Sequence, residues 1–136
     1  MDTQLPKMKK SSLRLFRYSE TFESAKAGQF IFKQGDTGET LYCVRAGTVH
    51  LMVGDTIVEI VEPGGIFGEV ALVDSNPRSA SALAATDCEI VPINRERFRY
   101  LVKNTPDFAL EVMSLMAQRL RRMNNQRTRP ADPGAD

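Results

Sequence analysis

The hydrophobic positions of this chain form short clusters up to Ile93 and follow a helical spacing after it. The early clusters are rich in apolar, β-branched and aromatic residues and are separated by Gly, Asp, Asn or Pro. They span Phe30–Phe32, Leu41–Val44, Val49–Val53, Ile57–Val61, Ser79–Ala85 and Cys88–Ile93. Short apolar runs with regular turns are typical of strands in an antiparallel sandwich or barrel. The pattern therefore predicts a mainly β fold, with a tight hairpin at Gly54-Asp55.

Two flanking helices are expected after the last strand. Asn94 is suited to cap the first helix and Asn104 to end it. Thr105-Pro106-Asp107 then resembles the N-cap and first turn of a second helix, where proline and an acidic residue both fit. Its apolar positions follow at steps of three and four: Phe108, Val112, Leu115, Met116, Leu120 and Met123. This predicts an apolar face down to about Asn124, on a helix of ~18 residues and ~27 Å.

The length of 136 residues predicts one domain, because it allows one sizeable core and is short for two. We expect a flexible N-terminus over residues 1–12, a domain over 13–125 and a flexible C-terminal tail over 126–136. Residues 13–22 are expected to form a short helical or irregular arm on the domain.

Composition and charge narrow the classes of function. Hydrophobic residues make up 42% and charged residues 26%, as in soluble globular proteins, and the net charge of +1 favours no particular partner. No segment is apolar enough to span a membrane, and the N-terminus lacks a signal peptide's apolar region, so we expect a cytoplasmic protein. Cys43 and Cys88 lack metal-ligand spacing. Buried free thiols are expected, with a disulfide or a sensor cysteine as the alternative.

Few residues of this sequence are candidates for catalysis or metal binding. His50 is the only histidine, so a site of several histidine ligands cannot be assembled, nor can a Ser-His-Asp arrangement be recognised around it. A hydrolase with paired carboxylates stays open, although nothing marks such a pair. We therefore expect no enzyme, no catalytic residue and no metal.

The segment from Gly64 to Ala80 combines glycines, a helix start and charged side chains. Gly68 leaves room for a ligand near the backbone, and Glu69 to Leu72 would form one helical turn whose N–H groups face an anion. Arg78 supplies a fork that matches two phosphate oxygens, and Ser79 adds a hydroxyl. Glu69 would repel a phosphate, so we expect it to accept a hydrogen bond from a sugar hydroxyl. An ordinary surface ion pair between Glu69 and Arg78 is the alternative.

The same segment carries a family resemblance. Phe67-Gly68-Glu69-x-Ala71-Leu72 together with Pro77-Arg78-Ser79-Ala80 resembles the phosphate-binding cassette of cyclic-nucleotide-binding domains. Such domains occur in bacterial catabolite activator proteins and in regulatory subunits of protein kinase A. Gly35-Asp36 and Pro63-Gly64 fit the same family, and the resemblance extends roughly from residue 28 to 124. It implies an antiparallel β-roll or jelly-roll barrel with a short cassette helix and two C-terminal helices.

The resemblance implies a cyclic nucleotide as ligand. Its phosphate would contact the N–H groups of Gly68 to Ala71 together with Arg78 and Ser79, and its ribose 2′-hydroxyl would bond to Glu69. The implied ligand-binding residues are Phe67, Gly68, Glu69, Val70, Ala71, Arg78, Ser79 and Ala80. A threonine in place of Ser79 would favour cyclic GMP by family analogy, so the serine favours cyclic AMP, but the sequence does not settle between them.

The resemblance also implies how a signal would leave the site. The base would lie between the barrel and the C-terminal helix, near Arg122, Met123 and Asn124. Leu72 would pack on a hinge that moves when the phosphate arrives. The helix from Thr105 to Asn124 would then close over the base and change a surface for an unknown downstream protein.

Several alternatives stay open. Catabolite-activator-type transcription factors continue into a winged helix-turn-helix that these 136 residues lack, so we expect a stand-alone domain without sequence-specific DNA binding, as a monomer or weak homodimer. A degenerate domain could instead serve as an interaction scaffold without nucleotide. A nucleic-acid-binding accessory protein could use the basic residues near both ends, although a solvated helix end explains the C-terminal ones more simply.

Overall fold

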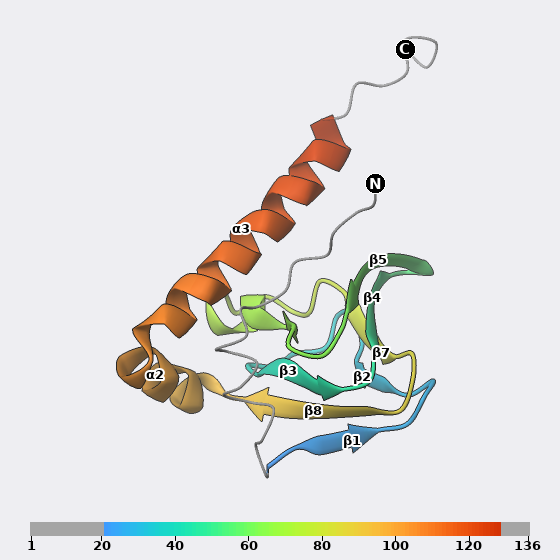
Figure 1. Ribbon diagram of the computed structural model, residues 1–136. Coiled ribbons are helices and arrows are strands. Elements are labelled where there is room, and N and C mark those ends of the chain that lie inside the picture. The colour runs from blue at the N-terminus through green and yellow to red at the C-terminus, as the bar shows by residue number, and fades with distance from the viewer. Residues whose placement is uncertain (1–20, 129–136) are drawn as a thin grey trace.

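The computed structural model describes residues 21–128, which fold into two antiparallel sheets followed by two helices. The strands are β1 (Glu23–Ala25), β2 (Phe30–Phe32), β3 (Leu41–Ala46), β4 (Val49–Val53), β5 (Thr56–Val61), β6 (Ile66–Phe67), β7 (Ser81–Ala84) and β8 (Cys88–Ile93). The helices are the 3₁₀ turn η1 (Glu69–Leu72), α2 (Arg95–Asn104) and α3 (Pro106–Thr128). The strand orders are β1-β8-β3-β6 and β2-β7-β4-β5 (Figure 1). The expected antiparallel β-roll with a cassette helix and two C-terminal helices is confirmed.

The six predicted strands are present, and two further strands were not predicted. β1 contains only one buried residue, Ala25, and is held as a strand by pairing with β8. β6 is only Ile66–Phe67 and pairs with Tyr42 and Cys43 of β3. Both strands are too short to show an alternating pattern, so only pairing with distant parts of the chain defines them as strands. The hairpin at Gly54-Asp55 is confirmed, with Gly54 at φ 60° between β4 and β5.

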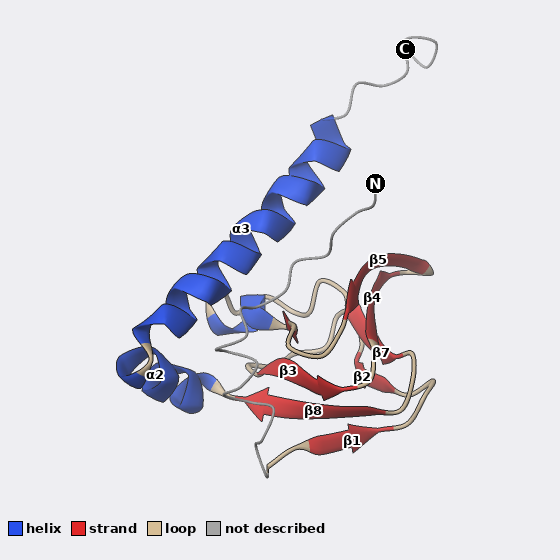
Figure 2. Cartoon of the chain, in the orientation of Figure 1, coloured by secondary structure: helices blue, strands red, loops and turns tan. Residues whose placement is uncertain are grey.

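Two hydrophobic clusters make the core. One lies between the two sheets and contains Phe67, Val44 and Ile90. The other joins β3 and β8 to the helices and contains Leu72 of η1, Leu101 of α2 and Phe108 of α3. Figure 2 shows the helices gathered at one end of the strands. The cassette turn therefore contributes to the same packed cluster as both C-terminal helices.

The start signals of the helices are confirmed, but the second helix differs from the prediction. Asn94 caps α2, and its side chain accepts a hydrogen bond from the N–H of Arg97 at 2.8 Å. α3 reaches Thr128, beyond the expected end near Asn124. Leu120 is 58% exposed, so it does not continue the buried face. Arg119 faces inward on that turn instead, with its side chain 12% exposed.

The methionines of α3 differ in burial, and both cysteines are buried. Met113 is 56% exposed on α3, whereas Met116 packs against the core. Cys43 and Cys88 are buried free thiols, as expected, and burial raises the pKa of Cys43 to about 12.

Among residues 21–128 no helix has the length and apolarity needed to cross a membrane. The expected arm at 13–22 and the flexible ends at 1–12 and 126–136 lie wholly or largely outside the described residues.

Candidate ligand-binding site

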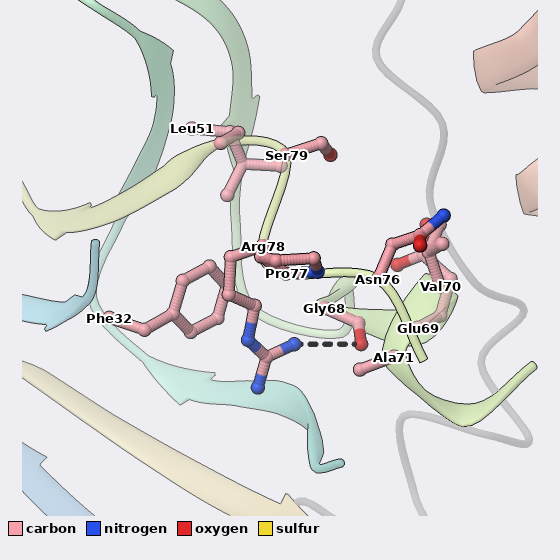
Figure 3. A pocket seen from close by; sticks show the side chains of 11 residues that line it. Phe32, Leu51, Gly68, Glu69, Val70, Ala71, Asn76, Pro77, Arg78 and Ser79 are labelled. Atoms are coloured by element: carbon pink, nitrogen blue, oxygen red, sulfur yellow. Dashed lines mark hydrogen bonds between the residues drawn. The ribbon is translucent and has the colours of Figure 1, made fainter. Parts of the chain in front are cut away.

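A pocket lies between the cassette and strands β2 and β4 (Figure 3). Its lining comes from these strands, from η1 and the glycine before it, and from the segment leading into β7. The lining residues are Phe32, Leu51, Gly68, Glu69, Val70, Ala71, Asn76, Pro77, Arg78, Ser79 and Ala80. Seven of the eight ligand-binding residues expected from the sequence are among them. Residues from distant parts of the chain thus meet at one surface depression.

Gly68 starts the cassette turn in a left-handed conformation with φ 80°. A Cβ at this position would lie 3.0 Å from Nη1 of Arg78 and 3.2 Å from the carbonyl oxygen of Thr40. The backbone conformation and the close neighbours both favour glycine here. The next residues, Glu69 to Leu72, form the expected single helical turn. One of its N–H groups is already used, because Ala71 donates to the carbonyl oxygen of Gly68 at 3.3 Å.

Arg78 is held in place by backbone carbonyl groups. Its Nη1 donates to the carbonyl oxygen of Gly68 at 3.2 Å and its Nη2 to that of Thr40 at 2.8 Å. The guanidinium also lies 4.0 Å from the centroid of the Phe32 ring, which stabilises a cation. Its Nε is buried and has no hydrogen-bond partner within residues 21–128. The side chain is therefore oriented in advance, and its Nε–H is left without an acceptor among the described residues.

The loop between β2 and β3 fixes the position of Arg78. The N–H of Arg78 donates to the carbonyl oxygen of Asp36 at 2.7 Å, and the N–H of Gly35 donates to that of Arg78 at 2.8 Å. Gly38 lies so close that a Cβ would be 2.9 Å from Nη2 of Arg78. Burial lowers the pKa of Arg78, while Tyr42, Asp36 and Glu69 act to raise it. The loop thus encloses the guanidinium on the side away from the cassette turn.

Glu69 is buried, and its partner is Arg119 of α3 rather than Arg78. Arg119 donates from Nη1 to Oε1 of Glu69 at 2.6 Å. It also donates from Nε and Nη2 to the two carboxylate oxygens of Glu59, at 2.7 and 2.9 Å, and from Nη2 to the carbonyl oxygen of Ile66 at 2.6 Å. No ion pair joins Glu69 to Arg78 in the described structure, so the simple surface pair considered above is not what these residues form.

The carboxylates of Glu59 and Glu69 determine the pKa of Arg119. Burial by itself would lower the pKa of Arg119, but the charge of Glu69 and the hydrogen bonds and charge of Glu59 outweigh it and raise the pKa. Arg122 adds a second cation, with Nη2 3.8 Å from Oε1 of Glu59. Two guanidinium groups of α3 therefore balance two buried carboxylates of the β-roll.

The remaining expected residues lie away from the lining. Phe67 is fully buried and stacks on Tyr42 at a centroid distance of 5.3 Å. Leu72 is buried in the cluster shared with α2 and α3. Of the three expected lid residues, Arg122 faces Glu59, Asn124 is exposed, and the side chain of Met123 lies outside the description. Neither Arg122 nor Asn124 lines the pocket, so their assignment to the base stays a prediction.

Sequence reasoning missed the residues that support the site. Phe32, Gly38 and Thr40 orient Arg78 from the opposite side of the pocket, and no local motif marks them. Arg119 and its partner Glu59 were missed as well, although a signal existed. The buried positions Phe108, Val112 and Leu115 of α3 are spaced by four and three, and four more residues lead to Arg119.

Comparisons with known proteins agree with this geometry. Residues 22–105 match the family described as "Cyclic nucleotide-binding domain". The "Cyclic AMP receptor protein" of Thermus thermophilus is 39% identical over 99 residues, which cover 69% of this chain and 46% of that protein. The chain thus spans about half the length of that relative.

Two solved structures extend the likeness. The crystal structure of Thermus thermophilus catabolite activator protein superposes with a TM-score of 0.70 at 32% identity, covering 86% of this chain and 55% of that one. A structure described as "A cyclic-GMP-dependent signalling pathway regulates bacterial phytopathogenesis" gives a TM-score of 0.65 at 28% identity, covering 92% and 98% of the two chains. Because the family match covers most of the chain and the fold agrees, this chain belongs to the cyclic nucleotide-binding domain family.

Proposed function

We propose that the chain is a cyclic-nucleotide sensor that takes cyclic AMP in preference to cyclic GMP and passes the binding event to a partner protein through α3. The observation that carries this proposal is the state of Arg78. Its guanidinium is anchored by two carbonyl groups at the edge of a pocket, and its buried Nε lacks a partner among the described residues. A buried unpaired donor is costly, so a turn of the guanidinium that brings this donor to an anionic ligand in the pocket would be favoured.

The cyclic phosphate would lie at the start of η1. Gly68 allows close approach of the backbone there, and the N–H groups of Glu69 and Val70 start the helical turn with the positive end of its dipole. Ser79 lines the same pocket as Arg78, and its hydroxyl would add a further donor. Together they offer donors to a singly charged phosphate from two sides of the pocket.

The sugar would be recognised by Glu69. Arg119 already balances the charge of Glu69, and the remaining carboxylate oxygen can accept a hydrogen bond from the ribose 2′-hydroxyl. Glu69 lines the pocket beside the phosphate-binding backbone. This combination of donors for phosphate and an acceptor for a hydroxyl favours a cyclic nucleotide over inorganic phosphate.

The preference for cyclic AMP rests on Ser79. By analogy with the family, in which a threonine at this position favours cyclic GMP, the serine favours cyclic AMP. The relative from Thermus thermophilus is named a cyclic AMP receptor protein. The solved structure of which this chain covers 98% is instead described with a cyclic-GMP-dependent signalling pathway. The base would be covered by the part of α3 near Arg122, Met123 and Asn124.

The signal would pass through Leu72 and α3. Leu72 ends η1 and packs in the cluster that also holds Leu101, Phe108 and Val112 of the helices. A shift of η1 on binding phosphate would therefore change how α3 packs, and α3 would present a different surface to a downstream protein. Such a switch requires that the ligand bind one arrangement better than the other. Unchanged hydrogen exchange along α3 on adding nucleotide would contradict this coupling.

Calorimetric titration of the purified protein with cyclic AMP and with cyclic GMP tests the proposal. We expect micromolar or tighter binding of cyclic AMP and weaker binding of cyclic GMP. Arg78→Ala should weaken binding roughly 10- to 100-fold, because a charge-assisted hydrogen bond contributes about 1.5–3 kcal/mol. Arg99→Ala is the matched control, because Arg99 is an exposed arginine of α2 that does not line the pocket.

The same titration separates the alternatives. No heat with either nucleotide would favour a domain that keeps the fold as an interaction scaffold. Equal loss of binding in Arg78→Ala and Arg99→Ala would show a general charge effect instead of a phosphate contact. A nucleic-acid-binding accessory protein would bind oligonucleotides with an affinity that falls steeply with added salt.

A further inference from the structure

Glu69 has two oxygens with different surroundings. Oε1 accepts a hydrogen bond from Nη1 of Arg119 at 2.6 Å. The donors within residues 21–128 reach only this oxygen, so Oε2 is the one left to accept a hydrogen bond from a ligand. Glu69 lines the pocket although its side chain is only 6% exposed. Arg119 therefore does not have to leave for Glu69 to receive a ligand hydroxyl.

Arg119 is itself held rigidly by Glu59. Its Nε and Nη2 meet the two oxygens of that carboxylate at 2.7 and 2.9 Å, in the fork arrangement that suits a guanidinium and a carboxylate. A third contact, to the carbonyl oxygen of Ile66, reaches the residue next to the cassette at 2.6 Å. With this geometry the guanidinium has little freedom to rotate, and Nη1 is directed at Glu69.

Glu59 lies next to the pocket without lining it. On β5 it pairs directly with Leu51 of β4, and Leu51 lines the pocket. Its side chain is only 6% exposed, and such burial of a carboxylate is unfavourable unless cations balance it. The cations come from α3, since Arg119 contacts Glu59 and Arg122 lies 3.8 Å away.

We propose that Glu59 and Arg119 are positioning residues for the ligand, forming a relay in which Glu59 fixes Arg119 and Arg119 presents Glu69 to the sugar hydroxyl. This inference rests on the proposed function, because it concerns the same pocket. It makes α3 part of the binding site before any ligand arrives. Removal of Arg119 would leave Glu69 without its only described cationic partner, free to turn away from the pocket.

A thermodynamic cycle between protein and ligand tests the relay. Cyclic AMP and its 2′-deoxy analogue are titrated into the wild-type protein, Arg119→Met and Glu59→Gln. Arg119→Met keeps the aliphatic stem and removes the donors, and Glu59→Gln keeps the size and removes the charge. We expect both variants to weaken cyclic AMP binding, Arg119→Met by about tenfold or more. The 2′-deoxy analogue should be affected less than about threefold, since it lacks the hydroxyl that the relay serves.

Arg121→Met is the matched control, because Arg121 is exposed on the same part of α3. It should bind both nucleotides as the wild type does. Circular dichroism of each variant reports whether the fold is kept. If Arg119→Met fails to fold, Glu59→Gln still tests the relay, since the guanidinium remains to balance Glu69.

The outcomes are distinct. Equal weakening of both nucleotides by Arg119→Met would overturn the relay, because α3 would then matter only for general packing. Tighter binding in that variant would also overturn it, since Arg119 would be an obstacle to the ligand. A wild type that binds cyclic AMP and its 2′-deoxy analogue equally well would refute the contact of Glu69 with the sugar and leave the nucleotide sensor intact. A wild type that binds neither would refute the proposed function itself.

Discussion

Three glycines allow backbone strain and the position of Arg78 to be tested separately. Gly28 has φ +89° and nothing within 4 Å of a Cβ, so alanine there adds strain alone. Gly38 has no positive φ, and a Cβ there would lie 2.9 Å from Nη2 of Arg78. Gly68 combines both conditions, with φ +80° and Nη1 of Arg78 at 3.0 Å. Alanine at each position therefore separates the two effects in one protein.

The magnitudes follow from these surroundings. A left-handed alanine costs roughly 1–2 kcal/mol, so Gly28→Ala and Gly68→Ala should each lower the melting temperature by several degrees. Gly38→Ala adds no left-handed strain, and the end of the flexible Arg78 side chain can move away, so the cost in stability should come only from the contacts that Arg78 loses. That movement breaks its hydrogen bond to Thr40. Binding of cyclic AMP should then weaken by roughly tenfold, as expected for the loss of a well-placed charged donor.

The assay pairs thermal unfolding with calorimetric titration for each variant. Gly28→Ala should lose stability through strain and keep its affinity, Gly38→Ala should lose affinity without the strain, and Gly68→Ala should show both effects. Wild-type affinity in Gly38→Ala would refute the reasoning, because Arg78 would then tolerate displacement. An equal loss of affinity in Gly28→Ala would refute it too, since strain at a residue that does not line the pocket would be enough.

Two further predictions concern the scaffold. Asn94→Ala should lower the free energy of unfolding by about 1 kcal/mol, because it removes the cap that accepts from Arg97, and denaturant unfolding measures this. Cys43 should resist iodoacetamide at pH 8 in the native state and react once unfolded, because burial raises the pKa of its thiol to about 12. The raised pKa means that the folded state holds this proton more tightly, so its stabilising contribution is full below the ordinary thiol pKa and is lost as the pH rises toward 12. Mass spectrometry of labelled peptides gives the first result, and unfolding at pH 8 and pH 10 gives the second.

The sequence was most informative where the determinants are local. The strand from Cys88 to Ile93, the cap at Asn94 and the turn after Gly68 are each encoded by neighbouring residues, and all three are confirmed. β6 could not be predicted, because two residues carry no period and its strand character comes from pairing with β3. The surroundings of Arg78 were equally hidden, since Thr40 lies 38 residues away and contributes only its carbonyl group.

The error on α3 came from weighing hydrophobicity alone. Leu120 extended the apolar series by composition, but the buried stripe from Phe108 through Val112 and Leu115 leads to Arg119. A charged residue in a buried stripe is normally taken to end it. Here the stripe continues, because Glu59 and Glu69 of the β-roll lie opposite and pair with the cation. Recognising this from sequence would require knowing that those two carboxylates are buried.

The first and the later turns of α3 make different contacts, which would let one helix stabilise the fold and also respond to the proposed ligand. Its first turns hold Leu72 and the hydrophobic cluster, where separation would expose apolar surface to water. Its later turns hold Glu69 through a cation, and the energy of that contact depends on what else the carboxylate binds. If the proposed ligand hydrogen-bonds to Glu69, it would change the balance on the later turns while the apolar turns stay packed. If α3 moves on binding, we expect the change to be largest from Arg119 onward and smallest around Phe108, and residue-resolved hydrogen exchange would show it. A uniform change along the whole helix would mean that α3 moves as a rigid rod and that the ionic contact does not direct the response.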